Sequence, residues 1–156
     1  MQGPNWFIGH FEKDKVTLAA NEVQMKHGIF VENCHETVIF IEGKFKSLQM
    51  NKCVGLTLVT QSCISGIEVM NCEDITMVVK GHSPSVTIDK CEKARLILNE
   101  DNLGCDIVTS KVSEFSISYI KTNGDEAKDF VVSEQLITCW NPAAKKFETK
   151  VYDKFM

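Results

Sequence analysis

Several features that mark common protein classes are missing from this sequence of 156 residues. No apolar run approaches the ~20 residues that a membrane-spanning helix needs. The opening residues, MQGPNWFIGH, lack the basic and then apolar layout of a secretory signal. No Asn-x-Ser/Thr glycosylation acceptor occurs. The seven cysteines are an odd number, so they cannot all pair, and we expect a reducing, cytoplasmic location.

Arginine and basic charge are also scarce. Arg95 is the only arginine, and the formal net charge is −4. A general nucleic-acid binder needs a basic surface to displace counterions, and bidentate recognition of phosphates or bases relies on arginine. The composition therefore argues against a nucleic-acid partner and, with no membrane-spanning run, against a membrane partner.

Catalytic motifs are absent as well. The sequence has no glycine-rich phosphate loop, no Gly-x-Ser-x-Gly elbow and no His-Glu-x-x-His pair, and its four histidines are scattered. We expect no enzyme activity, no catalytic residue, no cofactor and no metal site.

What the sequence does have is a repeat. Cysteines stand at positions 34, 53, 72 and 91, so the same interval recurs three times. Residues 30–48, 49–67, 68–86 and 87–105 align as four units, and residues 106–124 continue the frame with Ser110 in the cysteine position. Self-similarity at a short fixed period is typical of stacked repeat architectures.

Apolar residues recur two apart within each unit, the spacing that sends side chains to one face of a strand. The aligned columns are Ile29, Leu48, Ile67, Val86, Cys105; Val31, Met50, Val69, Ile88, Ile107; Ile39, Leu58, Met77, Leu96, Phe115; and Ile41, Thr60, Val79, Leu98, Ile117. Two β-segments per unit, stacked unit on unit, predict an all-β fold: a right-handed parallel β-helix with turns of about 19 residues. A leucine-rich repeat is the alternative, but so short a unit leaves little room for its helix.

The cysteine column has two interpretations. Four thiolates form structural zinc sites, but zinc needs ligands that converge on one point, whereas equivalent positions of stacked strands form a line. Free cysteine is among the most frequently buried residues. The pattern therefore favours a stack of small buried side chains at a corner.

The period is lost at both ends of the chain. We expect one domain over residues 1–156: a cap with Trp6, Phe7, Ile8 and Phe11 and an irregular first turn over 1–29, regular turns over 30–124, and a crossover and hairpin over 125–156. An isolated hairpin is only marginally stable, so this one must pack on the last turn or on a second copy. Exchange of the hairpin or its strand would produce a homodimer, with Phe147, Val151, Tyr152 and Phe155 at the contact.

Two outward features remain open. Arg95 falls in an outward column with Val38, Thr57, Thr76 and Glu114, and it is either an arginine finger for a GTPase or an ordinary solvated residue. Phe40, Val59, Val78 and Ile97 form an apolar outward row, which binds a protein partner, is covered by another strand or the capping segments, or is internal because the alternation slips.

The chain as a whole resembles the C-terminal domain of cyclase-associated proteins, which regulate actin monomers. The resemblance is carried by four stretches: NLGCDIVTSKVSEFSISY (102–119), VSEQLITCWN (132–141), EGKFKSLQMNKC (42–53) and VKGHSPSVTIDKC (79–91). It implies a parallel β-helix that dimerises through exchanged C-terminal strands.

The same resemblance implies binding to monomeric actin, mainly in its ADP form, and promotion of nucleotide exchange on it. The family-like stretches place the expected actin contacts at Lys111, Ser113, Glu114, Glu134 and Gln135. The fold-level resemblance extends to tubulin-folding cofactor C, whose β-helix activates a GTPase. The alternative function is therefore GTPase activation through Arg95.

Overall fold

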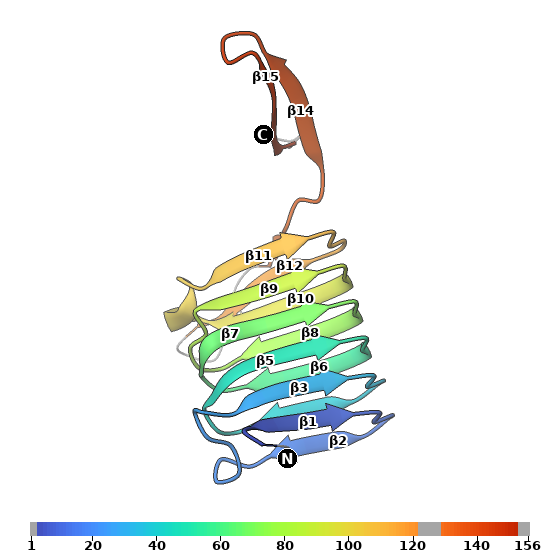
Figure 1. Ribbon diagram of the computed structural model, residues 1–156, viewed down its shortest axis with the longest axis vertical. Coiled ribbons are helices and arrows are strands. Elements are labelled where there is room, and N and C mark those ends of the chain that lie inside the picture. Colours follow the sequence, from blue (N-terminus) through green and yellow to red (C-terminus); the bar gives the residue numbers. More distant parts are fainter. Residues whose placement is uncertain (1–2, 122–128, 153–156) are drawn as a thin grey trace.

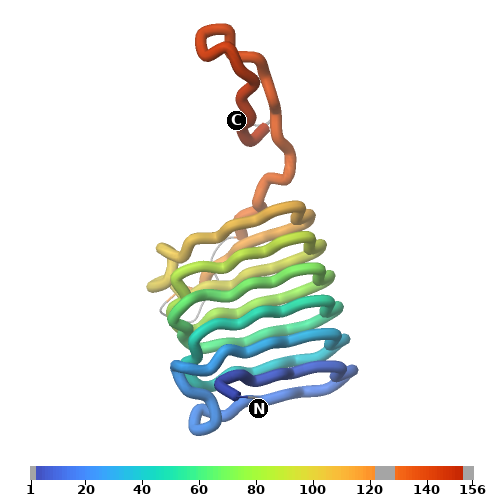
Figure 2. Tube along the Cα trace, in the orientation of Figure 1, coloured from blue at the N-terminus to red at the C-terminus, as the bar shows by residue number. Residues whose placement is uncertain are grey.

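The computed structural model describes residues 3–121 and 129–152. The chain winds into a right-handed coil whose strands lie in two stacks (Figures 1 and 2). The first parallel sheet contains β1 (Asn5–Gly9), β3 (Gly28–Glu32), β5 (Phe45–Asn51), β7 (Cys63–Met70), β9 (Ser85–Asp89) and β11 (Asp106–Ser110). The second contains β2 (Lys15–Leu18), β4 (Val38–Ile41), β6 (Val54–Thr60), β8 (Glu73–Val79), β10 (Glu92–Asn99) and β12 (Ser116–Ile120).

A short strand, β13 (Phe130–Val131), pairs antiparallel with β12 and closes the edge of the second sheet. The only helical element in the described part is a 3₁₀ turn, Glu100–Asn102. No helix among the described residues is long and apolar enough to cross a membrane. The expected all-β fold, a right-handed parallel β-helix, is confirmed.

The core lies between the two sheets and is built from the inward columns. β3, β5, β7 and β9 pair in register, so that Ile29, Leu48, Ile67 and Val86 stack, each at most 1% exposed. Ile39, Leu58, Met77 and Leu96 stack in the opposite sheet in the same way. Successive turns stand one strand separation apart, ~4.8 Å, so like residues lie over like and no turn buries its apolar row alone.

Each corner that leads from the first sheet to the second uses a left-handed backbone at two positions. The first position has φ from 53° to 63° at His10, Asn33, Lys52, Asn71, Lys90 and Lys111. The second has φ from 48° to 67° at Lys13, Glu36, Gly55, Asp74, Lys93 and Glu114. The two left-handed residues flank the buried position of the corner, which is a cysteine in four turns. This backbone reverses the chain within a few residues, and glycine and asparagine adopt it most readily.

The last turn, formed by β11 and β12, corrects the predicted frame. Leu96 pairs with Ile117 and Val86 pairs with Ile107, so the step from the turn below is longer by two positions than the steps between the regular turns of the repeat. The extra length lies around the 3₁₀ turn, where Asn102 is 2% exposed and its amide, oriented to satisfy both polar atoms, bonds the backbone N–H and C=O of Ser83 at 3.3 Å.

As a result, the left-handed residues Lys111 and Glu114 flank Val112. Val112, rather than Ser110, therefore occupies the cysteine position. Phe115 is buried but lies two positions before the column of Leu96.

The N-terminal end is more regular than the sequence predicted. Trp6, Phe7 and Ile8 belong to β1, which pairs in parallel with β3, and β2 pairs with β4 in the same manner. β1 and β2 thus form a complete first turn. The step from this first turn to the next, from Val16 to Ile39, is longer than the steps between the regular turns. It accommodates a loop over residues 19–27, in which Val23 is buried at the end of the core.

A hairpin of β14 (Leu136–Asn141) and β15 (Lys146–Val151) projects beyond the last turn (Figure 1). The two strands pair only with each other in the described chain. The expected hairpin is present, and it stands away from the solenoid.

Candidate functional site at the last turn

Three of the predicted contact residues form the corner of the last turn. Lys111 and Glu114 have φ of 55° and 51°, and Ser113 lies between them. The Ser113 N–H donates to the carbonyl of Cys91 at 3.1 Å, and the Ser113 carbonyl accepts from the Lys93 N–H at 3.0 Å. These bonds fix the corner to the turn below, while Lys111 and Glu114 are exposed.

The structure brings a fourth predicted residue to this corner. Glu134 lies 20 positions from Glu114 in the chain, yet its carboxylate accepts a hydrogen bond from the Glu114 N–H at 3.1 Å. Gln135 follows at the base of the hairpin, where its carbonyl accepts from the Tyr152 N–H at 3.0 Å. Lys111, Ser113, Glu114 and Glu134 therefore form one polar cluster, and Gln135 lies beside it in sequence.

Glu134 is the last residue of a segment over residues 129–134, here called the strap. Contacts between the rest of the strap and the last turn hold Glu134 in place. Phe130 and Val131 pair with β12, and the Val132 N–H donates to the carbonyl of Phe115 at 3.0 Å. The Phe130 ring stacks on Tyr119 with centroids 6.4 Å apart. An open strand edge invites uncontrolled pairing, and the strap covers this edge while it leads the chain to the hairpin.

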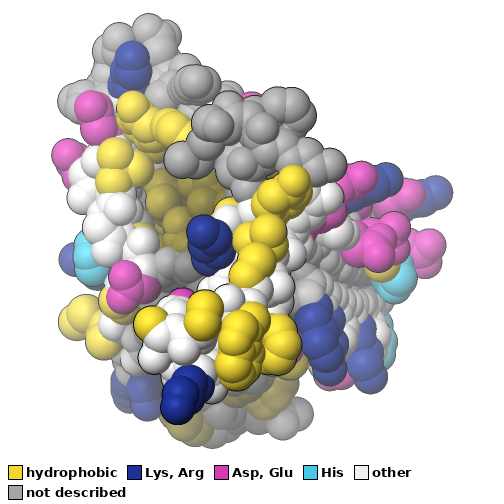
Figure 3. All heavy atoms as spheres, turned by 90° about the horizontal axis from the view of Figure 1, so that it is seen from above, with side chains coloured by type: hydrophobic (Ala, Val, Ile, Leu, Met, Phe, Trp, Pro, Cys, Tyr) yellow, Lys and Arg dark blue, Asp and Glu magenta, His cyan; other side chains and the backbone are white. Residues whose placement is uncertain are grey.

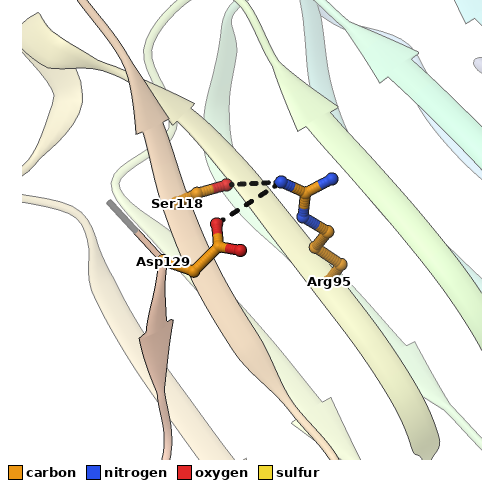
Figure 4. Close-up of polar contacts among 3 residues, drawn as sticks. All are labelled: Arg95, Ser118 and Asp129. Carbon is orange, nitrogen blue, oxygen red and sulfur yellow. Dashed lines mark hydrogen bonds and ion pairs between the residues drawn. The ribbon is translucent and has the colours of Figure 1, made fainter. Parts of the chain in front are cut away.

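Arg95 fastens the strap from the outside (Figure 4). Its Nη2 lies 3.4 Å from Oδ1 of Asp129 and donates to Oγ of Ser118, also at 3.4 Å. Ser118 is fully buried, so the guanidinium links β10, β12 and the strap. Because Arg95 has these partners within the chain, an arginine finger is not favoured, and a purely solvated role is also wrong.

The outward column of Arg95 is only partly as predicted. Val38, Thr57 and Thr76 do stack below it, but Ser116 lies above it instead of Glu114. The longer step to the last turn accounts for the difference.

The apolar outward row is confirmed as a stack on the outer face of the second sheet. Phe40, Val59 and Val78 are partly buried there, and Ile97 is 9% exposed. The Lys15 ammonium lies 5.1 Å from the centroid of the Phe40 ring. In the last turn, the position that continues this row is the buried Ser118, which pairs with Ile97.

The hairpin carries a separate apolar face. Leu136 pairs with Val151 and Trp140 pairs with Phe147, and these four side chains are 53–68% exposed. The Trp140 and Phe147 rings meet edge to face at 5.2 Å. Figure 3 views the molecule from this end and shows hydrophobic side chains exposed there. Tyr152 follows at 37% exposure, and the predicted contact Phe155 lies outside the described residues.

The cysteine column is buried, as the sequence indicated, and all seven cysteines are free. Hydrogen bonding to the Cys72 thiol lowers the pKa of Cys53 and of Cys91 to about 7, against the opposing effect of burial. Those same two contacts raise the pKa of Cys72. No group of three or more His, Cys, Asp or Glu side chains in the described chain is arranged to hold a metal ion.

Comparison with known proteins decides the family. The model of the family described as "Adenylate cyclase associated (CAP) C terminal" matches residues 1–154. The chain belongs to this family.

Relatives of this CAP C-terminal domain include adenylyl cyclase-associated protein from Hydra viridissima, 30% identical over 98% of this chain and 31% of that protein. Human adenylyl cyclase-associated protein 2 is 33% identical over 90% of this chain and 29% of that protein. The crystal structure of cyclase-associated protein from Cryptosporidium parvum superposes with a TM-score of 0.91, at 25% identity, over 97% of this chain and 93% of that one. The chain thus spans about a third of the length of these curated relatives.

Sequence reasoning missed part of this CAP domain's polar framework. Asp129 and Ser118 carried no signal, because they lie 34 and 23 positions from their partner Arg95 and only the fold brings them together. The left-handed corners did leave a trace, in the Asn or Lys that precedes each cysteine of the repeat.

Proposed function

We propose that this CAP C-terminal domain binds monomeric actin, mainly in its ADP-bound form, and promotes the exchange of ADP for ATP. The observation that carries the proposal is the family match over residues 1–154, together with a solved relative of the same fold. The assembly of Lys111, Ser113, Glu114 and Glu134 into one polar cluster supports the placement of the actin contacts in the last turn.

The proposed activity needs no bond chemistry. A protein that binds the nucleotide-loosened form of actin more tightly than the closed form raises the population of the loosened form, and differential affinity is sufficient for this. A rigid surface serves this purpose, because little conformational freedom is then lost on binding. The last-turn cluster is such a surface, since the backbone of Ser113 and the N–H of Glu114 are both held by hydrogen bonds.

We propose further that the domain acts as a homodimer in which each hairpin packs on the other copy. The hairpin exposes Leu136, Trp140, Phe147 and Val151 on one face, and a two-stranded hairpin alone is marginally stable in water. β11 is the last strand of its sheet among the described strands, so its outer edge is a suitable partner for a hairpin strand. We also propose that the domain is located in the cytoplasm, because the reducing conditions there keep thiols such as these unpaired.

Uptake of a fluorescent ATP analogue by ADP-actin tests the first proposal. We expect the protein to accelerate uptake and Lys111→Asn to reduce the acceleration roughly fivefold, the effect of losing about 1 kcal/mol at a contact residue. Asparagine suits the left-handed backbone, since Asn33 and Asn71 occupy the same column.

Lys52→Asn is the matched control, because Lys52 has the same backbone conformation three turns below Lys111. It is expected to leave the exchange rate unchanged. Equal losses of the acceleration in the two variants would show that the last-turn cluster is not part of the actin interface. Absence of any acceleration by the unmodified protein would refute the proposed activity itself.

A further inference from the structure

Four buried thiols form a ladder along one corner of the solenoid. Cys34, Cys53, Cys72 and Cys91 lie in consecutive turns and are 0, 0, 4 and 1% exposed. Each Sγ contacts the carbonyl oxygen two positions earlier, at 3.6, 3.5, 3.2 and 3.3 Å respectively. Because the same contact recurs in these four consecutive turns, the sulfur atoms repeat at the strand separation of ~4.8 Å. The thiol ladder is therefore a straight line of sulfur atoms along the solenoid axis.

This geometry excludes some metal ions and suits others. A tetrahedral ion needs four converging ligands, and no such group exists in the described chain. A linear, two-coordinate ion needs only two sulfur atoms on opposite sides. Two bonds of the ~2.3 Å length known for zinc–thiolate contacts span ~4.6 Å, close to the separation of neighbouring ladder sulfurs. Soft monovalent ions such as Cu(I) select thiolate ligands.

We propose that neighbouring thiols of the ladder bind a soft monovalent ion of the Cu(I) class, one ion for each pair. Binding forms two metal–sulfur bonds, breaks two S–H bonds and releases two protons, so that the bound unit has one negative charge. No oxidation or reduction takes place. The Cys53 N–H donates to the Sγ of Cys72 at 3.5 Å, which stabilises negative charge on that sulfur. Cys34 with Cys53 forms one pair, and Cys72 with Cys91 forms the other.

Burial determines how the ion enters. The four sulfurs lie inside the corners, so an ion reaches them only when a corner opens locally. Uptake is therefore slower than binding to the exposed thiol of Cys139. A clean measurement requires a background in which Cys105→Ser and Cys139→Ser remove the thiols that are not fully buried.

Native mass spectrometry with silver(I), a redox-stable probe of the same class, tests the proposal in this background. The intact ladder is expected to retain two silver ions after desalting. Cys34→Ala with Cys91→Ala leaves the neighbouring pair Cys53 and Cys72 and is expected to retain one ion. Cys53→Ala with Cys72→Ala leaves two sulfurs three turns apart and is expected to retain none.

The two double variants contain the same number of thiols and differ only in whether two sulfurs are neighbours. Circular dichroism establishes that each is folded before silver is added, and Cys63→Ala, a buried thiol outside the ladder, controls for thiol count. Equal silver retention in the two double variants, or no retention by the intact ladder, would overturn the proposal. X-ray absorption of the silver-loaded protein supports it if silver has two sulfur neighbours and contradicts it if there are three or more.

Discussion

Two fully buried threonines differ in how their hydroxyl groups are satisfied. The Thr37 hydroxyl donates to the carbonyl of His35 at 2.8 Å, whereas the Thr60 hydroxyl has no hydrogen-bond partner in the described part of the chain. Thr60 also stacks between Ile41 and Val79 in an apolar column. A buried hydroxyl without a partner retains its desolvation cost, which a methyl group of the same shape does not have.

We therefore predict opposite effects for the same substitution at the two positions. Thr60→Val is expected to raise the free energy of unfolding by about 1 kcal/mol, and Thr37→Val to lower it by about 1 kcal/mol. Urea denaturation followed by circular dichroism measures both. A destabilised Thr60→Val protein would indicate that the Thr60 hydroxyl is satisfied.

Glycine is required at one turn for reasons of space. A Cβ atom at Gly81 would lie 2.6 Å from the backbone nitrogen of Ser62 in the turn below, whereas one at Gly104 would meet nothing within 4 Å. We predict that Gly81→Ala destabilises the protein by about 2 kcal/mol, the usual scale of overpacking. Gly104→Ala is the matched control and should leave the melting temperature almost unchanged. Similar melting temperatures for the two variants would show that the turns separate easily.

At the scale of elements, the strap is held in part by the Arg95–Asp129 ion pair, whose members are 38% and 57% exposed. Solvent screening limits the value of such a pair to about 0.5 kcal/mol. We predict that Arg95→Ala lowers stability by this amount, and that a double-mutant cycle with Asp129→Asn gives a coupling of the same size. The Lys13–Glu36 pair, longer at 4.0 Å and 73% and 65% exposed, should give no measurable coupling. A zero coupling for Arg95 would mean that the ion pair adds nothing to the pairing of β13, the Val132 hydrogen bond and the Phe130 ring contact in holding the strap.

The elements that the sequence predicted best are those that repeat. Cysteine at a fixed interval and apolar residues two apart define β3 to β10 and their registers, because each turn must match its neighbour to bury its inward row. The last turn was misplaced by two positions because Asn102, a polar residue, enters the core by bonding to the backbone of Ser83. Such a bond has no periodic signal.

The candidate site shows the same limit. Lys111, Ser113 and Glu114 were predicted as contacts from the family-like stretches, and they lie together because they are close in sequence; their role as actin contacts stays a prediction. The contact of Glu134 with the Glu114 N–H depends on the path of the strap, which no local pattern encodes.

At the scale of the whole molecule, the two specialised features lie at one end. The polar cluster lies on the last turn and the hairpin follows it, whereas the opposite end of the solenoid is formed by β1, β2 and the loop over residues 19–27 (Figure 1). Under the proposed dimerisation, a solenoid with this arrangement presents its non-repeating parts at the end where the second copy packs. Dimerisation would therefore bring two last-turn clusters together and give the dimer two equivalent binding surfaces.

The hairpin allows a direct test of dimerisation, because neighbouring positions face opposite sides. Phe147 lies on the exposed apolar face beside Trp140, whereas Glu148 pairs with Cys139 on the other face. Phe147→Lys places a charge on the proposed contact and is expected to reduce the mass in light scattering from two chains to one at micromolar concentration. Glu148→Lys introduces the same side chain at the next position and is expected to remain a dimer.

The unmodified protein must be dimeric for this comparison, and a monomer at every concentration would refute the hairpin-mediated assembly. If both variants dissociate equally, the charge itself, rather than the loss of the Phe147 contact, separates the copies, and the apolar face is not the interface.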